Sequence, residues 1–400
     1  MPWSRVVGQE RATETLARAL ASGRVAGTYL FHGPPGTGPR AAALAFAQAL
    51  QCERRGRTAD RRGGPDGDAC GVCLACTKAA RLVHPDVHVY LPFPRVSTRA
   101  GQDDRPADYA ERLARLALDP YAPVDYRQRA TLDAEGVTNK QVQHRKTPVD
   151  QFLRHDMTFV PAEGRHVVGI LTDADRLRTE AANSLLKLLE EPAPDVVLVL
   201  TAERVENVLP TILSRCQRVR FDPLPAAAIE GALVARDVPA DRAAFVARMA
   251  DGSFTRALEL VGSEALQAHR ALALDFLRTA YTGRPDLVAP AVAEAAGLGR
   301  ETLKGWFDLV TAWVRDLVLQ AAGAGDRLVN VDQAEAVGKF VAHLPDADLP
   351  AMAALVAQAA DAVEANGNAT LVLTALAFGL RDAMLGRSTG RLFTPLDVAA

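Results

Sequence analysis

The segment that most constrains the fold is a glycine-rich loop between a short apolar strand and a helix. Residues 29–32 have the apolar run of a buried strand, and residues 41–50 are typical of a helix. Between them lies Gly33-Pro34-Pro35-Gly36-Thr37-Gly38-Pro39-Arg40. A strand, a glycine-rich loop and a helix in this order form the frame of a phosphate-binding loop, in which backbone N–H groups surround phosphate oxygens.

The last two positions of this loop do not carry the side chains that bind nucleotide. After the final glycine the motif requires a lysine for the β- and γ-phosphates and a serine or threonine for Mg²⁺. Pro39 and Arg40 stand there instead. Proline has neither a cation nor a backbone N–H, and a guanidinium cannot be a neutral oxygen ligand of Mg²⁺. We therefore expect Gly33, Gly36, Gly38, Pro39 and Arg40 to form a degenerate, empty nucleotide site.

The composition is that of a globular protein with balanced charge. The 400 residues are 48% hydrophobic, which is enough for two or three domains with their own cores. There are 46 lysines and arginines against 48 aspartates and glutamates, so the net charge of −2 creates no general attraction for nucleic acid. The N-terminus lacks the order of a signal peptide, and no run of about 18 apolar residues occurs. We expect a cytoplasmic protein without a membrane segment.

Four of the five cysteines lie near one another in the sequence, at Cys52, Cys70, Cys73 and Cys76. Disulfides are rare in a reducing compartment, and a spacing of three residues lets the last three thiolates turn toward one centre. Cys52, from the end of the preceding helix, can complete a tetrahedral sulfur site for a structural Zn²⁺. Two alternatives stay open: unrelated free thiols, and an iron–sulfur cluster, whose fourth ligand normally lies downstream beside a proline. The fifth cysteine, Cys216, is expected to be a packing residue.

Further apolar runs alternate with helical segments. Residues 167–171 and 196–200 read as buried strands, residues 87–90 as a further strand, and residues 180–191 as a helix that stops at Pro192. Strands that alternate with helices predict a parallel, doubly wound sheet.

The end of the strand at residues 167–171 bears on ATPase chemistry. In a working ATPase, acidic residues at this point hold magnesium through water and orient the attacking water. Thr172 occupies the first of these places, and Asp173 only approximates the second. This second element of an ATPase is therefore also degraded.

A polar segment rich in Pro, Gly, Asp and Arg, residues 92–146, reads as an insertion. It contains a basic tract, Lys140, His144, Arg145 and Lys146. Runs of basic residues usually lie in solvated loops; the alternative is that this tract contacts the phosphate backbone of a nucleic acid.

The order of the motifs resembles a known family over nearly the whole chain. The sequence contains Val7-Gly8-Gln9, the glycine loop, the four-cysteine module, Leu185-Leu186-Lys187-Leu188-Leu189-Glu190-Glu191-Pro192 and Ser214-Arg215-Cys216. This order is similar to that of the bacterial DNA polymerase III clamp loader, an AAA+ family. Within the family it resembles the delta' subunits, whose phosphate loop is commonly degenerate, more than the gamma/tau subunits, whose loop is intact.

The resemblance implies an α/β AAA+ module, a small helical lid and an all-α collar. The implied domains are residues 1–221 (base domain, with the cysteine module at 52–76 and the insertion at 92–146), 222–263 (lid) and 264–400 (collar). In the collar, an apolar stripe would pack helices in any bundle: Leu303, Trp306, Phe307, Val310, Trp313, Val314 and Leu317. The resemblance implies that this collar joins subunits into a ring.

The resemblance also assigns roles to single residues. Arg215 would be an arginine finger that acts on ATP bound by a neighbouring subunit, whereas spacing alone favours a surface or ion-paired arginine. Thr201 and Arg256 would stand at the first and second sensor positions of the degenerate nucleotide site, together with Asp173. For the segment around Arg256 the alternative is helix packing, with Ser253 as the cap.

The expected function is therefore a delta'-like subunit of the clamp loader that does not hydrolyse ATP. It would help load the sliding clamp onto primed DNA, in a cytoplasmic hetero-oligomer with gamma/tau and delta subunits of the DNA polymerase III holoenzyme, a DNA-directed DNA polymerase. The alternative is an active AAA+ ATPase of gamma/tau type. A third class, a free-standing DNA-binding module, would need salt-sensitive affinity for DNA, which the balanced charge disfavours.

Overall fold

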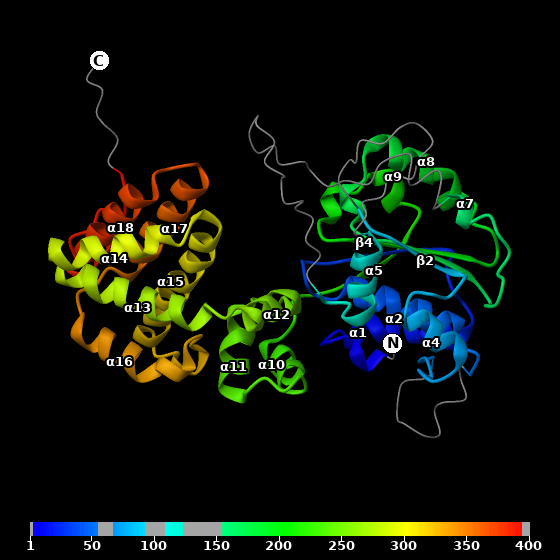
Figure 1. Ribbon diagram of the computed structural model, residues 1–400, viewed down its shortest axis with the longest axis horizontal. Helices are drawn as coiled ribbons and strands as arrows, with labels where there is room; N and C mark the ends of the chain where they lie inside the picture. Colours follow the sequence, from blue (N-terminus) through cyan, green and yellow to red (C-terminus); the bar gives the residue numbers. More distant parts are fainter. Residues whose placement is uncertain (1–2, 55–66, 93–108, 123–153, 394–400) are drawn as a thin grey trace, which may run out of the picture. The chain divides into compact units, whose positions relative to one another are not determined.

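The computed structural model in Figure 1 describes residues 3–54, 67–92, 109–122 and 154–393. The chain forms two compact units. The first comprises the residues up to 237 together with 250–259, and the second comprises 238–249 together with the residues from 260 onward. The three domains expected from the sequence, with boundaries at residues 221 and 263, stay a prediction.

The first unit is built on a five-stranded parallel sheet with the strand order β2-β3-β4-β1-β5. The strands are β1 (Thr28–His32), β2 (Val87–Tyr90), β3 (Val167–Leu171), β4 (Val196–Ala202) and β5 (Gln217–Arg220). β1 lies between β4 and β5, with Leu30 opposite Leu200 on one side and Arg218 on the other. Because all strands run the same way, the carboxyl ends of β1, β3 and β4 meet at one edge of the sheet.

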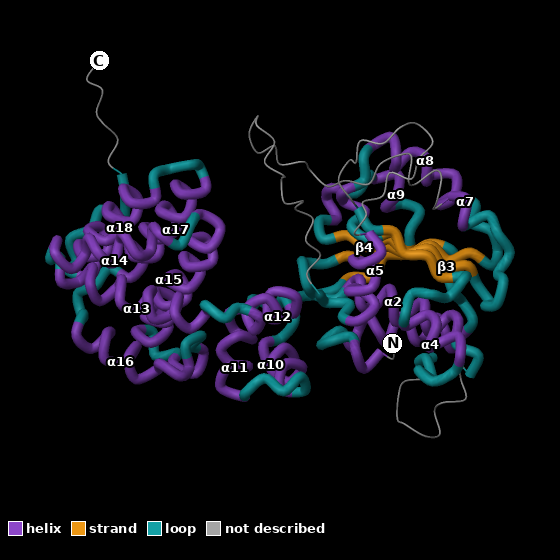
Figure 2. Tube along the Cα trace, viewed as in Figure 1, coloured by secondary structure: helices purple, strands orange, loops and turns teal. Residues whose placement is uncertain are grey.

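Helices cover both faces of this sheet (Figure 2). One face packs against helices α1 (Glu10–Ser22), α2 (Pro39–Gln51), α4 (Leu74–Ala80) and α5 (Tyr109–Leu118). The other face packs against α8 (Thr179–Glu190) and α9 (Pro210–Leu213). Along β1, Tyr29 and Phe31 belong to the first core and Leu30 to the second, as the alternation of side chains in a strand requires. Every residue of β3 and β4 is buried, which is typical of a covered parallel sheet.

The other helices of nine or more residues are divided between the two units. α10 (Ala226–Val234) and the first part of α12 (Phe254–Gly262) belong to the first unit. The second unit is all-helical and contains α11 (Ala240–Met249), α13 (Leu266–Thr282), α14 (Pro285–Gly297), α15 (Arg300–Ala321), α16 (Ala334–His343), α17 (Leu349–Glu364) and α18 (Ala369–Met384). All seven residues of the predicted apolar stripe are buried on α15, which packs against α17.

The predicted fold class, a parallel sheet with flanking helices followed by an all-helical C-terminal region, is confirmed. Part of the predicted insertion contributes to the core of the first unit: Tyr109 and Leu116 of α5 are buried, and the Tyr109 hydroxyl accepts a hydrogen bond from the Leu91 N–H (3.0 Å). Its basic tract, Lys140 to Lys146, lies outside the described residues. Among the helices that the structure describes, none has the length and apolarity to cross a membrane.

Candidate functional site

The glycine-rich loop has the backbone shape of a phosphate-binding loop. It follows β1 directly, and α2 begins at Pro39 with Gly38 as its N-cap. Gly36 and Gly38 have φ angles of +74° and +107°, a region that L side chains rarely adopt. Pro39 at the first helical position is compatible with the helix, because the N–H that proline lacks would have no partner within the helix. The substitution thus preserves the loop while removing one N–H donor from it.

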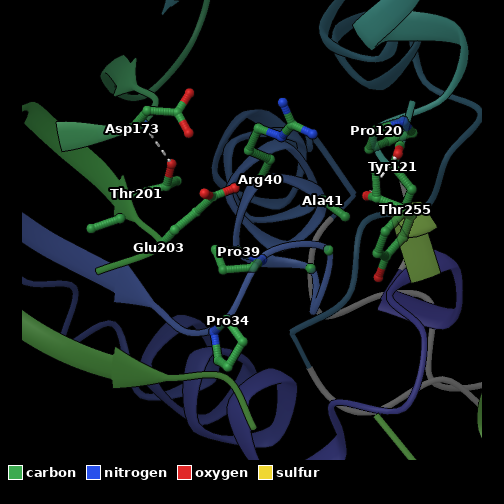
Figure 3. A pocket seen from close by; sticks show the side chains of 13 residues that line it. Pro34, Pro39, Arg40, Ala41, Pro120, Tyr121, Asp173, Thr201, Glu203 and Thr255 are labelled. Carbon is green, nitrogen blue, oxygen red and sulfur yellow. Dashed lines mark hydrogen bonds between the residues drawn. The ribbon is translucent and has the colours of Figure 1, made fainter. Parts of the chain in front are cut away.

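The predicted nucleotide site surrounds a cavity of only about 30 Å³ (Figure 3). Six of the predicted residues line this cavity: Gly36, Gly38, Pro39, Arg40, Asp173 and Thr201. In Figure 3, Asp173, Thr201 and Glu203 lie on one side of Arg40, and Tyr121 and Thr255 lie on the other. A cavity needs roughly 10–15 Å³ to hold one water, so this one has room for only about two waters and is far too small for a nucleotide.

The acidic side of the cavity is formed at the ends of β3 and β4. The N–H of Asp173 donates to the hydroxyl of Thr201 (3.1 Å), and both residues are buried. Burial raises the pKa of the Glu203 carboxyl, the negative charges of Asp173 and Asp175 raise it further, and the positive charge of Arg40 opposes these effects. The guanidinium of Arg40 therefore places a positive charge beside the acidic cluster of Asp173, Asp175 and Glu203.

The two other predicted nucleotide residues do not line the cavity. The N–H of Gly33 donates to the carbonyl of Ala202 (3.2 Å), which joins the loop to β4. The N–H of Arg256 donates to the hydroxyl of Ser253 (3.2 Å), so Ser253 caps the start of α12 as the alternative interpretation of this segment proposes.

Arg215 lies in the turn between α9 and β5, outside the cavity of its own chain. The Thr28 hydroxyl donates to its backbone carbonyl (2.6 Å), which fixes the turn to β1. The guanidinium forms an ion pair with Glu190 at the end of α8 (2.7 Å) and donates to the carbonyl of Thr211 (2.9 Å). The Arg215 side chain is nevertheless 34% exposed, so the guanidinium can be reached from solvent.

The structure brings the four predicted cysteines together between the end of α2 and the start of α4. The sulfur atoms of Cys52, Cys70, Cys73 and Cys76 all lie within 4.8 Å of one another, and the sulfurs of Cys70 and Cys76 are 3.9 Å apart. In a tetrahedral zinc site, with Zn–S bonds of about 2.3 Å, neighbouring sulfurs are roughly 3.8 Å apart. The donor set and its spacing therefore fit a closed structural Zn²⁺ site.

Three of these sulfurs accept hydrogen bonds from the backbone. Backbone N–H groups donate to the sulfurs of Cys52, Cys70 and Cys73, at 3.3, 3.3 and 3.4 Å. A hydrogen bond from the Cys76 thiol lowers the pKa of Cys52 to about 5, although burial opposes this, and the same bond raises the pKa of Cys76. The fifth cysteine, Cys216, packs against the core on the other face of the sheet, and burial raises its pKa to about 11.

Comparison with known proteins identifies the family. A family model described as "DNA polymerase III, delta subunit" matches residues 8–225, more than half of the chain. The chain belongs to the DNA polymerase III delta' subunit family. The match begins at the Gly8-Gln9 motif and ends just before α10, so it spans the sheet, the phosphate loop, the cysteine cluster and Arg215.

Several known proteins resemble this member of the delta' family. DNA polymerase III subunit delta' of Bacillus subtilis is 28% identical over 263 residues, which are 66% of this chain and 62% of that protein. The gamma/tau subunit of Mycobacterium bovis is 28% identical over 234 residues, which are 58% of this chain and 31% of that protein. The solved structure of a gamma subunit-related protein from Thermotoga maritima aligns with 93% of this chain and 99% of its own, at 18% identity and a TM-score of 0.36. The chain thus spans less than two thirds of the length of these two sequence relatives.

Three residues at or beside the predicted nucleotide site were not predicted from the sequence to be part of it. The side-chain amide of Gln9 donates to the carbonyls of Thr37 (2.9 Å) and Asp222 (2.7 Å), so Gln9 links the glycine-rich loop to the segment after β5. Glu203 directly follows β4, and this place at the carboxyl end of a parallel strand is the signal that could have found it. Tyr121 has only a weak signal, because it is one of several aromatic residues scattered through a polar, proline-containing segment.

Proposed function

We propose that this chain is the delta' subunit of a bacterial DNA polymerase III clamp loader that does not hydrolyse ATP itself. Its partners would be gamma/tau and delta subunits, the sliding clamp and, through the complex, primed DNA, in a cytoplasmic hetero-oligomer. The observation that carries the proposal is the combination of Pro39 and Arg40 at the decisive loop positions with a cavity of about 30 Å³ where a nucleotide would have to lie.

We further propose that Arg215 is an arginine finger for ATP on a neighbouring subunit. A guanidinium stabilises the negative charge that develops on a transferred phosphoryl group, and in other NTPases this accelerates hydrolysis by roughly 10³ to 10⁵. Arg215 is partly exposed, and its backbone is fixed to β1. Its ion pair with Glu190 is also partly exposed, so a triphosphate can replace the carboxylate at little cost.

The cysteine cluster is proposed to hold a structural Zn²⁺. With four thiolate ligands the metal would have no open position for chemistry, and it would join the end of α2 to the start of α4. The alternative is that the same four thiolates bind an iron–sulfur cluster.

The finger is tested in the clamp loader reconstituted with its ATPase subunits. Arg215→Ala is expected to lower the DNA-stimulated ATP hydrolysis of the neighbouring site while the complex still assembles. Arg218→Ala, at an exposed position three residues downstream, is the matched control and should leave hydrolysis unchanged. Equal rates for wild type and Arg215→Ala would reject the finger.

The active gamma/tau-type ATPase is the second candidate, because similarity to gamma/tau extends over 58% of this chain. The isolated wild-type chain decides between the two. Stoichiometric binding of Mg–ATP with turnover would establish the ATPase and overturn the non-hydrolysing subunit.

A further inference from the structure

We infer that residues 119–122 are an internal plug that occupies the chain's own nucleotide site, with Tyr121 in the space that a nucleotide would need. This inference rests on the proposed function, because it concerns the same degenerate loop. It goes further in one respect: the site is closed by a particular segment as well as by the loss of two nucleotide-binding side chains.

Tyr121 lies directly over the N-terminus of α2. It is 2% exposed, and its hydroxyl accepts a hydrogen bond from the N–H of Val7 (2.9 Å). A Cβ atom placed on Gly38 would lie 2.7 Å from this hydroxyl, so the phenol is in contact with the N-cap of the helix. A helix N-terminus after a glycine-rich loop is the place where phosphate oxygens are held. The ring also makes an edge contact with Phe254, at 5.0 Å and 89° between the planes.

The plug is joined to the loop and to the start of α12. Arg40 donates to the carbonyl of Ala122 (3.2 Å), and Thr255 donates to the carbonyl of Tyr121 (2.9 Å). Arg40 therefore binds the plug from one of the two positions at which the loop departs from its consensus. Beside the loop, the N–H of Phe254 donates to the carbonyl of Gly36 (3.0 Å), which closes the start of α12 over it.

A second anchor lies at the start of the plug. The carboxylate of Asp119 accepts two hydrogen bonds from the guanidinium of Arg236 (2.7 and 3.3 Å) and one from the N–H of Tyr121 (3.0 Å). The segment is thus held at both ends, and its aromatic side chain is held in the middle.

The plug does not imitate a phosphate; it excludes one. Burial raises the pKa of the Tyr121 hydroxyl to about 12, so the group is neutral at physiological pH. With Tyr121 in place, about 30 Å³ remains, whereas sites for small molecules are typically about 300 to 1,000 Å³. A nucleotide can enter only if Tyr121 moves away.

The test measures binding of Mg–ATP and of ADP by titration calorimetry to the full chain. Pro39→Lys restores the missing cation but leaves the plug in place, and it is expected to bind neither nucleotide. Pro39→Lys combined with Tyr121→Ala should bind at least tenfold more tightly than Pro39→Lys alone. The matched control combines Pro39→Lys with Tyr121→Phe, which keeps the ring and should also fail to bind.

A milder variant keeps the inference testable if Tyr121→Ala does not fold. Asp119→Ala removes an anchor that is partly exposed, and together with Pro39→Lys it should increase binding severalfold. Equal binding by Pro39→Lys with and without the plug substitutions would overturn the plug. That result would leave the non-hydrolysing subunit standing, which only binding and turnover of ATP by the wild-type chain would contradict.

Discussion

Asp86, a buried carboxylate, fixes the start of β2 to the segment that leads into β3. It is 3% exposed and accepts hydrogen bonds from the N–H groups of Ala162 (2.6 Å), Glu163 (2.9 Å) and Gly164 (2.6 Å). Burial alone would raise the pKa of Asp86, but these three N–H groups and nearby His84 outweigh it and hold the pKa below its ordinary value. The ionised form is therefore the one that stabilises the fold.

This pKa shift predicts an acid-sensitive contribution to stability. Because the pKa is lower in the folded chain than in the unfolded chain, the stabilisation is complete above about pH 4 and is lost as the pH falls through the folded-state pKa. Asp86→Asn should lower the free energy of unfolding at pH 7 by about 1–3 kcal/mol. It should also weaken the acid dependence, measured as urea midpoints at pH 7 and pH 3. An acid dependence identical to that of wild type would contradict this role, and Asp195→Asn, at an exposed position, is the control.

Single residues differ in how far the sequence predicts them. The loop glycines, the four cysteines and Pro39 could be identified because their chemistry depends on residue type and on local spacing. Tyr121 and Asp86 could not, because their partners lie 114 residues away at Val7 and 76 residues away at Ala162. No local pattern encodes such contacts.

At the scale of elements, the cysteine cluster connects two helices that each contribute to it. Cys52 is the C-cap of α2, and Cys73 is the N-cap of α4, with its sulfur accepting from the N–H of Cys76. Residues 55–66, between the two helices, lie outside the described part of the chain. Because the four sulfurs that fit one metal come from the ends of both helices and the segment before α4, we expect a metal bound by these thiols to help fix α4 against α2.

Removal of one ligand tests this dependence. The purified chain should contain roughly one zinc ion, and Cys73→Ser should lose it and melt at a lower temperature. Cys216→Ser, which alters the cysteine outside the cluster, should keep the metal. Metal analysis by mass spectrometry, with thermal unfolding followed in parallel, checks both variants. A native wild-type chain free of metal would refute the zinc site. Iron in place of zinc would establish the alternative iron–sulfur cluster.

Most of the predicted strands have a continuous apolar signal, whereas β2 was predicted from Val87, Val89 and Tyr90 although only Val87 is buried. β1, β3 and β4 were found because their residues are almost all buried. β5 was missed because only Val219 of its four residues is buried, so no apolar run marks it. α5 was hidden inside a polar segment that was interpreted as an insertion.

At the scale of the whole molecule, the balanced charge limits direct contact with DNA. With 46 basic and 48 acidic side chains, the isolated chain lacks the excess of positive charge that drives non-specific binding. Any contact of this chain with DNA would have to be local or shared with other subunits of a complex.

Fluorescence anisotropy with a primed duplex checks this expectation. The isolated chain should bind no more tightly than the roughly 10⁻⁴ to 10⁻⁶ M typical of non-specific binding at physiological salt. The reconstituted clamp loader with ATP serves as the positive control. Nanomolar, strongly salt-dependent binding by the chain alone would instead favour a free-standing DNA-binding module.

The packing of Gly36 has a consequence for how such motifs are interpreted across genomes. A methyl group on this residue would collide with the hydroxyl of Ser253, and its φ of +74° already disfavours other residues. Natural selection can therefore retain the glycine for its fit to a neighbouring segment, whether or not ATP ever binds. Surveys that count only glycines will overestimate the number of ATPases, whereas the two positions after the last glycine and the segment packed above them give a better criterion.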